Sequence, residues 1–269
     1  MVKKILLNFL KKKNHKNKVL KIYKKIFKTS NVNVIFTHKN NVYVVFKKKE
    51  KIYRKFAINK SGVQKIINDY KGLNWYCLRN KISSKKILLQ FKKKTKNIAF
   101  IDTKEIRGIK VKTWISLNKN YKYVLPIFNH YKKIFIKKKL HKIHGDLTLD
   151  NIFFEKKSIF FIDWEFFGTK KKLWGYDLVY LVLSSISLPY IANKVYSKAD
   201  EKIFLQLWKK LKTMKINKEL LNDPFNFFKQ EIKTDILLKK SFNISKEKFF
   251  PFLTPIKFQN RILQSIKKL

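Results

Sequence analysis

The hydrophobic periodicity is mostly that of strands before Arg107-Gly108 and mostly that of helices after it, and this contrast constrains the fold more than any other feature. Before it, apolar residues alternate with polar ones in three stretches separated by turn-like residues: 32–36, 42–46 and 52–56. Such alternation predicts a three-stranded antiparallel meander. A helical face and two further strand candidates follow, at 61–80, 87–91 and 98–101. The first part of the chain is therefore predicted to be β-rich, with one internal helix.

Beyond Arg107 the periodicity is mostly helical. One helix is predicted over 121–140, with an interruption or start at Pro126. Helical patterns also run from Tyr176 to the end, broken at Pro189, Pro224, Pro251 and Pro255. Two short strands stand between them, 152–154 and 159–162. We expect an α+β fold with two lobes. Residues 1–107 would form a basic helical extension and a small β-rich lobe, and residues 108–269 a larger helical lobe.

The net charge of +47 needs an explanation before any functional argument is made. A strongly basic chain suggests nucleic acid or another polyanion as a partner. However, the chain has 60 lysines and only four arginines, and arginine is the residue that reads phosphates and base edges with two hydrogen bonds. The lysines are also spread from end to end. We therefore expect compositional background and no specific nucleic acid, while binding to nucleic acid or an anionic surface stays the alternative function.

Membrane insertion and disulfide bonding are not expected. Residues 1–28 form a basic amphipathic helical pattern, which leaves a weak association with an anionic membrane surface open. The apolar run 178–192 contains serines and Pro189 and is too short to span a bilayer. A single cysteine, Cys77, excludes an internal disulfide framework. A cytoplasmic protein is predicted, and nothing in the sequence indicates its oligomeric state.

The scarce carboxylates carry more information than the lysines. Six of the 17 acidic residues fall within the 32 residues 146–177, where even spreading would place about two. They are Asp146, Asp150, Glu155, Asp163, Glu165 and Asp177. Such a cluster indicates either a cation site or a local salt-bridge network with neighbouring lysines.

Spacing favours the cation site. His144-Gly145-Asp146-Leu147 is followed by Asn151, and a short predicted hairpin leads to Asp163. The same eight-residue spacing occurs in the H-x-D-L-x-x-x-N catalytic loop of kinases, which a metal-binding Asp follows. Phosphoryl transfer needs one carboxylate at the attacking hydroxyl and oxygen ligands for a Mg²⁺ ion on the nucleotide phosphates. A tight loop leading into a hairpin can present all of them on rigid backbone.

These residues resemble the aminoglycoside phosphotransferase and choline kinase superfamily, whose members carry Gly where protein kinases usually have Arg, as at Gly145. The run Ile162-Asp163-Trp164-Glu165 through Gly168, followed by Asp177, is similar to the choline, ethanolamine and thiamine kinase branch. The resemblance implies a protein-kinase-like two-lobe fold and a small-molecule kinase that uses ATP and Mg²⁺. It implies Asp146 as the catalytic carboxylate, Asn151 and Asp163 as metal ligands, and His144 and Asp177 as braces of the loop.

The resemblance also implies a lysine on the third strand of the first lobe, paired with an acid on the next helix. Lys55 is the candidate lysine and Asp69 the candidate acid, while Arg54, on the opposite face of the strand, is the rival. No glycine-rich phosphate loop is present. The polar stretch 37–41 would have to cover the phosphates, with Thr37, Asn40 and Asn41 as its candidate contacts.

The acceptor substrate is expected to be a small-molecule alcohol. Choline or ethanolamine is the first hypothesis, because Glu165 and an aromatic group of Trp164, Trp174, Tyr176 and Phe166 could hold a cationic head group. Thiamine or a sugar stays open. Asp150 is a further candidate contact, with a turn or cap role as its alternative. A catalytically inactive relative is a third possibility, although Asp146, Asn151 and Asp163 are all present.

Overall fold

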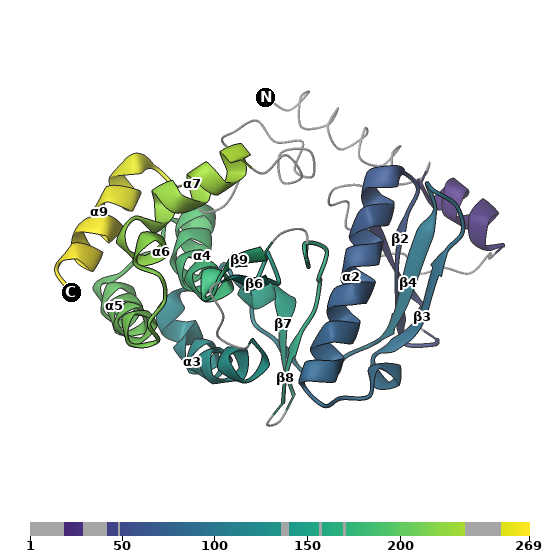
Figure 1. Cartoon of the computed structure of the whole chain (residues 1–269), viewed down its shortest axis with the longest axis horizontal. Coiled ribbons are helices and arrows are strands. Elements are labelled where there is room, and N and C mark those ends of the chain that lie inside the picture. The colour runs from purple at the N-terminus through teal and green to yellow at the C-terminus, as the bar shows by residue number, and fades with distance from the viewer. Residues whose placement is uncertain are drawn as a thin grey trace.

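The computed structural model describes residues 19–28, 42–47, 49–135, 140–155, 158–168, 171–234 and 254–269. They form two lobes, a β-rich one and a helical one, which stand side by side (Figure 1). One hydrophobic core runs from the small lobe into the large one and includes Ile66 and Leu73 as well as Leu181. The predicted two-lobe α+β fold is confirmed.

The small lobe is built on one antiparallel sheet. Its strands are β1 (Val42–Lys47), β2 (Ile52–Ala57), β3 (Leu88–Lys93) and β4 (Ala99–Lys104), in the order β1-β2-β4-β3. All three pairings are antiparallel, so the two later strands join the sheet of the first two. The strand predicted at 32–36 lies outside the described residues.

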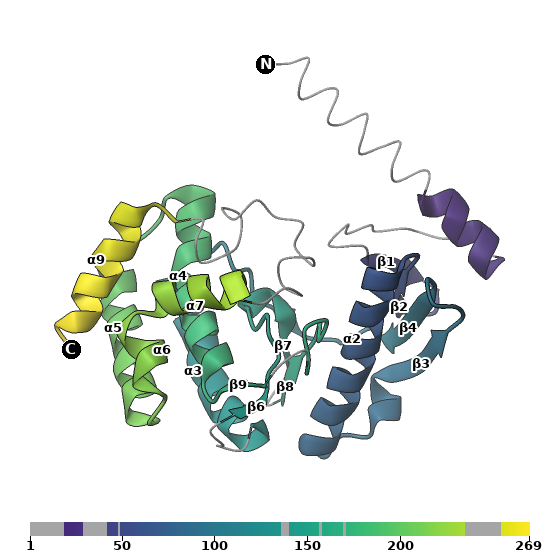
Figure 2. The ribbon, with the colours of Figure 1, turned by 45° about the horizontal axis from the view of Figure 1, so that its top comes forward.

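Helices cover both faces of this sheet. Helix α2 (Lys60–Arg79) follows β2 and begins at Asn59, whose side chain accepts the N–H of Gly62 at 2.8 Å. It lies between the sheet and the helical lobe (Figure 1). On the other face, residues 19–27 are helical and pack Tyr23 and Phe27 against Phe56 (Figure 2). The rest of the predicted N-terminal helix, residues 1–18, lies outside the described residues.

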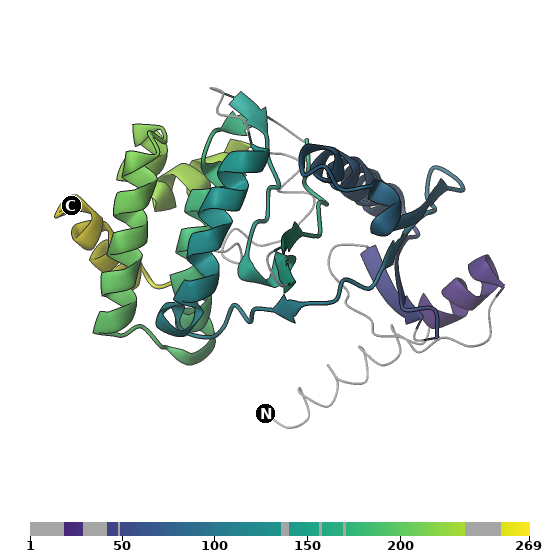
Figure 3. The same cartoon turned by 90° about the horizontal axis from the view of Figure 1, so that it is seen from below.

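A single segment leads from β4 into the helical lobe, and the predicted boundary at Arg107-Gly108 falls within it (Figure 3). It contains β5 (Ile109–Lys110), which pairs with the hairpin of β7 (Ile152–Glu155) and β8 (Ser158–Phe161). A second small sheet pairs β6 (Leu140–Lys142) with β9 (Lys171–Leu173). The predicted hairpin is therefore present, and it lies between α2 and the large helices (Figure 1).

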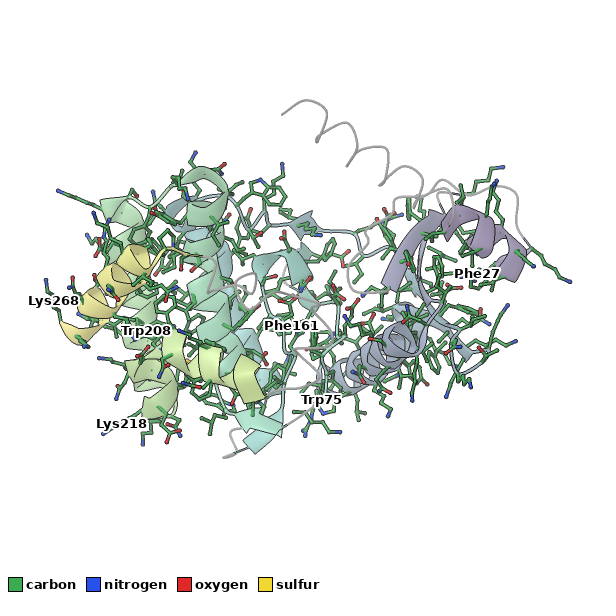
Figure 4. All side chains as sticks on the ribbon, turned by 90° about the horizontal axis from the view of Figure 1, so that it is seen from above. Phe27, Trp75, Phe161, Trp208, Lys218 and Lys268 are labelled. Atoms are coloured by element: carbon green, nitrogen blue, oxygen red, sulfur yellow. The ribbon has the colours of Figure 1, made fainter. Side chains whose placement is uncertain are left out.

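The described part of the large lobe is mostly helical. Its helices are α3 (Leu117–Ile134), α4 (Tyr176–Asn193), α5 (Lys198–Thr213), α6 (Lys218–Asn222), α7 (Pro224–Thr234) and α9 (Ile256–Lys267). Helix α4 is the buried centre of the lobe. Trp208 lies inside the lobe, whereas Lys218 and Lys268 lie at its outer rim (Figure 4). Within the described residues, no helix combines the length and hydropathy that a membrane span requires.

Two predicted helix breaks are wrong. Helix α3 begins at Leu117 and continues through Pro126, which is exposed, so water can reach the backbone carbonyl that the proline leaves unpaired. Pro189 lies inside α4 instead of ending it. A proline in a helix interior costs about 3 kcal/mol, and the burial of apolar side chains along nearly all of α4 outweighs that cost.

Candidate active site

A cleft of about 650 Å³ lies where the two lobes meet. It is lined by β1, β2 and β4 of the small lobe, by the connecting segment 104–110, and by residues around the β7–β8 hairpin. Its size is within the range of cofactor sites. Lys55, Asp69 and Asp163 line it, although they lie far apart in the sequence. A larger hollow of 940 Å³ adjoins Lys71 and Phe167, but none of the predicted site residues lines it.

Lys55 and Arg54 point to opposite faces of β2, as alternation along a strand requires. The Lys55 ammonium lies 2.7 Å from Oδ2 of Asp69 and 2.8 Å from Oδ1 of Asp163. Arg54 instead makes two hydrogen bonds to Asp102 on β4, and its guanidinium lies 4.5 Å from the ring centre of Phe27. The lysine therefore faces the cleft, and the rival arginine belongs to the packing under the N-terminal helix.

Asp69 connects α2 to the segment that carries Asp163. One carboxylate oxygen binds Lys55, and the other accepts the backbone N–H of Trp164 at 2.8 Å. The shorter Asp reaches both partners because Gly72, one turn further along α2, lets the helix approach Trp164 closely. A Cβ on Gly72 would lie 2.4 Å from that of Trp164. Burial alone would lower the pKa of Lys55, but Asp163, Asp69 and Glu165 raise it above its usual value.

His144 and Asp177 hold the loop that carries Asp146. Asp177, in the first turn of α4, accepts the backbone N–H groups of His144 and Gly145, both at 2.9 Å. The His144 ring donates from Nε2 to the carbonyl of Ile162 at 2.8 Å, and burial lowers its pKa to about 4, so the ring is neutral. Gly145 has a φ of +90°, and a Cβ there would lie 2.5 Å from that of Phe166.

The side chains of Asp146 and Asn151 lie next to each other in this loop. The Asn151 amide nitrogen donates to the Asp146 backbone carbonyl at 2.8 Å and lies 3.4 Å from its Oδ2. A further contact was missed in the sequence: Tyr180 on α4 donates its hydroxyl to Oδ1 of Asp146 at 3.2 Å. Tyr180 follows Asp177 by three residues, and this spacing places both on one helix face. The sequence therefore contained a pattern from which the position of Tyr180 near the loop could have been predicted.

Asn151 and Asp163 offer the donors that a magnesium ion prefers. Hydrogen bonding through its amide nitrogen orients Asn151, and its amide oxygen and the Asp163 carboxylate are hard oxygen ligands. Asp163 has a φ of +66°, a conformation that is uncommon outside glycine but that aspartate adopts more readily than most residues. The described residues contain no group of three or more His, Cys, Asp or Glu side chains that could hold a metal alone. Asn151 and Asp163 therefore fit a metal ion that nucleotide phosphates also coordinate.

Glu165 has a partner that was not foreseen. Its Oε2 lies 3.8 Å from the ammonium of Lys65, which is buried on α2. Burial and the neighbouring Asp163 raise the pKa of Glu165, while burial lowers the pKa of Lys65. Lys65 precedes Asp69 by one helical turn. Lys65 could not be singled out from the sequence, because the chain has many other lysines.

The aromatic residues predicted to contact the substrate are packed in the core. Trp164 is fully buried and donates from its indole to the Phe161 carbonyl, and Trp174 is buried and donates to the Phe135 carbonyl. Both rings pack in the hydrophobic core, and Trp164 also borders the cleft between the lobes. Tyr176 and Phe166 are buried as well.

Of the remaining candidates, Asp150 makes a contact within the protein, and the others lie outside the described residues. Asp150 accepts the hydroxyl of Thr113 at 2.6 Å and so ties the loop to the segment that connects the lobes. This long-range hydrogen bond is neither the predicted substrate contact nor the turn or cap role that was its alternative. Thr37, Asn40 and Asn41 lie outside the described residues, so their predicted contact with the phosphates stays a prediction.

No protein-family model matches the chain, and no curated protein matches it. Among solved structures, the chain is similar to an amicoumacin kinase in complex with AMP-PNP and Ca²⁺, at 12% identity and a TM-score of 0.42, over 88% of this chain and 86% of that one. It is also similar to Plasmodium vivax ethanolamine kinase, at 13% identity and a TM-score of 0.38, over 88% and 82%.

Proposed function

We propose that this protein transfers the γ-phosphate of ATP to a hydroxyl group of a small molecule. The observation that carries the proposal is the position of Lys55, whose ammonium touches both Asp69 and Asp163 at the inner end of the cleft between the lobes. A cation held there by two carboxylates can bind an anionic phosphate group, because its position is already set before the ligand arrives.

Each residue then has a defined task. Lys55 binds the phosphates, and Asp146 orients the acceptor hydroxyl and takes its proton as the new P–O bond forms. Asn151 and Asp163 would hold Mg²⁺, which neutralises charge on the phosphates when it is bound. The backbone bonds from His144 and Gly145 to Asp177 keep Asp146 in place. A cytoplasmic location, where ATP is available, stays a prediction.

The acceptor hypothesis changes with the structure. Choline and ethanolamine were favoured because Trp164, Trp174 and Glu165 were expected to form a site for a cation. The two tryptophans are buried in the core, and Glu165 faces Lys65. Choline therefore loses its special support, and the proposal names a small-molecule alcohol without that preference.

An ADP-release assay over a panel of small alcohols tests the proposal. The panel contains choline, ethanolamine, thiamine, sugars and aminoglycosides, with Mg²⁺ and ATP present throughout. We expect one or more of them to raise ADP release, and Asp146→Asn to lower the turnover by about 100-fold or more while leaving AMP-PNP binding intact. Turnover close to that of the wild type in Asp146→Asn would refute the mechanism, and a failure to bind AMP-PNP would refute the function.

A further inference from the structure

The hollow of 940 Å³ beside helix α2 is separate from the cleft, because the two share no lining residue. One wall is a face of α2 that carries residues 64, 68, 71 and 75, which are spaced by four, three and four positions. The other wall consists of Lys142 at the end of β6 and of Phe167 and Gly168, in the segment that follows Asp163. The hollow therefore lies between α2 and the helical lobe.

The side chains that line this hollow suit an anion with a flat ring. Three of them are aromatic, three are carboxamides and two are lysines, Lys71 and Lys142, and none of the described lining residues is acidic. Both lysines are exposed, and neither forms an ion pair with a described residue. Nζ of Lys142 lies 5.5 Å from the ring centre of Phe167, and that ring centre lies 5.2 Å from that of Trp75. The hollow thus presents positive charge next to two aromatic rings.

The walls of the hollow are the same two elements that position Lys55. Asn68, which lines the hollow, donates from its amide to the backbone carbonyl of Glu165 at 3.0 Å. The next residue, Asp69, accepts the N–H of Trp164 and binds Lys55. A molecule that touches both walls would therefore hold α2 against the segment 163–168, and this contact keeps the carboxylates of the cleft beside Lys55.

We propose that this hollow is a second ligand site, which binds a small aromatic anion and thereby tightens nucleotide binding in the cleft. The lysines bind the phosphate or carboxylate group of the ligand, while its ring lies against Phe167 and Trp75. The ligand contacts both walls only when α2 is packed as described, so its binding stabilises that arrangement. The site itself stands on the lining of the hollow, whereas its effect on the nucleotide rests on the proposed function.

Calorimetric titration of the full chain with 1-naphthyl phosphate and with 1-naphthoate tests the site and distinguishes the two kinds of anion. Inorganic phosphate and 1-naphthol supply the charge alone and the ring alone. We expect at least one naphthyl anion to bind about tenfold more tightly than either of these, and Lys71→Gln/Lys142→Gln to weaken it about tenfold. Lys60→Gln/Lys119→Gln removes the same charge at exposed positions outside the hollow and should keep the affinity.

Three results would overturn the site. They are the absence of binding by both naphthyl anions, an equal loss in the two double variants, which would indicate unspecific attraction to a basic chain, and a loss in Lys55→Met, which would place the ligand in the cleft. Lys55→Met should instead keep the affinity for the naphthyl anion, because Lys55 does not line the hollow.

The effect on the nucleotide is measured by titrating AMP-PNP with and without a saturating naphthyl anion. We expect the affinity for AMP-PNP to rise about fivefold, and the affinity for the naphthyl anion to rise by the same factor when AMP-PNP is bound. Unchanged or weaker AMP-PNP binding would overturn the coupling. A chain that does not bind AMP-PNP under either condition would instead reject the proposed function, and the naphthyl titrations would still decide the site.

Discussion

Lys55 and Asp163 are 108 residues apart in the chain, yet Nζ of the lysine lies 2.8 Å from Oδ1 of the aspartate. The first residue belongs to the sheet of the small lobe and the second to the segment that follows the β7–β8 hairpin. The contact therefore fixes how the two lobes meet. It does so with the two side chains that are proposed to bind the phosphates and their metal ion, so lobe packing and ligand binding depend on the same ion pair.

The neighbours Lys55 and Arg54 should separate binding from stability. We expect Lys55→Met to weaken AMP-PNP binding by about 10- to 100-fold, since a charge-assisted contact to phosphate is worth about 1.5–3 kcal/mol. Arg54→Met should leave that affinity unchanged and lower the free energy of unfolding by about 3 kcal/mol, because it strands the buried carboxylate of Asp102. Calorimetric titration and urea unfolding measure the two effects. Equal loss of affinity in both variants would contradict the assignment of Lys55.

Tyr180 is expected to position Asp146 for the proposed reaction. Tyr180→Phe removes only the hydroxyl that donates to Oδ1 of Asp146. We expect kcat to fall about tenfold, which corresponds to the loss of about 1.4 kcal/mol, with the KM for ATP unchanged. Tyr190→Phe, near the other end of α4, is the control and should keep full turnover. A rise in KM for ATP at constant kcat would show that Tyr180 affects ATP binding and does not position Asp146.

Gly72 should be intolerant of even a methyl group. In Gly72→Ala the new Cβ would lie 2.4 Å from the Cβ of Trp164, so helix α2 has to move away. We expect a loss of about 1–2 kcal/mol in the free energy of unfolding, even though Ala favours helices by about 1 kcal/mol. Turnover should fall as well, because Asp69 moves with the helix. Lys71→Ala, at the exposed neighbouring position, should change stability by less than about 0.5 kcal/mol. Normal turnover in Gly72→Ala would show that the close approach of α2 to Trp164 is not needed for activity.

His130 should make the fold sensitive to acid. Burial and the nearby Lys133 lower its pKa to about 4, and its Nε2 lies 3.0 Å from the Tyr76 hydroxyl. The unfolded chain takes up a proton near pH 6.5, whereas the folded state resists it until about pH 4. The contribution of His130 to stability is therefore full above pH 6.5 and is lost as the pH falls toward 4.

The comparison with His130→Gln isolates this single group. Gln has no proton to gain, so wild type should lose about 1–3 kcal/mol relative to the variant between pH 6.5 and pH 4. Urea unfolding at a series of pH values measures the difference. A constant difference across this range would show that His130 keeps its ordinary pKa in the folded state.

Local patterns were predicted with the best accuracy. The strands β1 and β2, helix α2 and the β7–β8 hairpin occur close to the expected residues, because alternation and helical spacing act within a few positions. The break at Pro189 was wrong because the burial of α4 outweighed a local preference, and the break at Pro126 was wrong because the proline lies on the exposed face of α3. Trp164 and Trp174 were expected at the substrate, and their burial in the core was not foreseen for a related reason. An aromatic residue near a reactive loop can face either the core or the site, and only its neighbours decide which.

The sequence by itself determined the order of the elements, the spacing of His144, Asp146 and Asn151, and the placement of Asp163 beyond a short hairpin. These features are local, so they can be recognised without knowing how distant segments pack. Only the tertiary structure decided that Lys55 rather than Arg54 faces the cleft, that Tyr180 reaches Asp146, and that Lys65 lies beside Glu165. Each of these contacts joins elements that lie far apart in the chain. Burial and neighbouring charges decide which of the 60 lysines make such contacts.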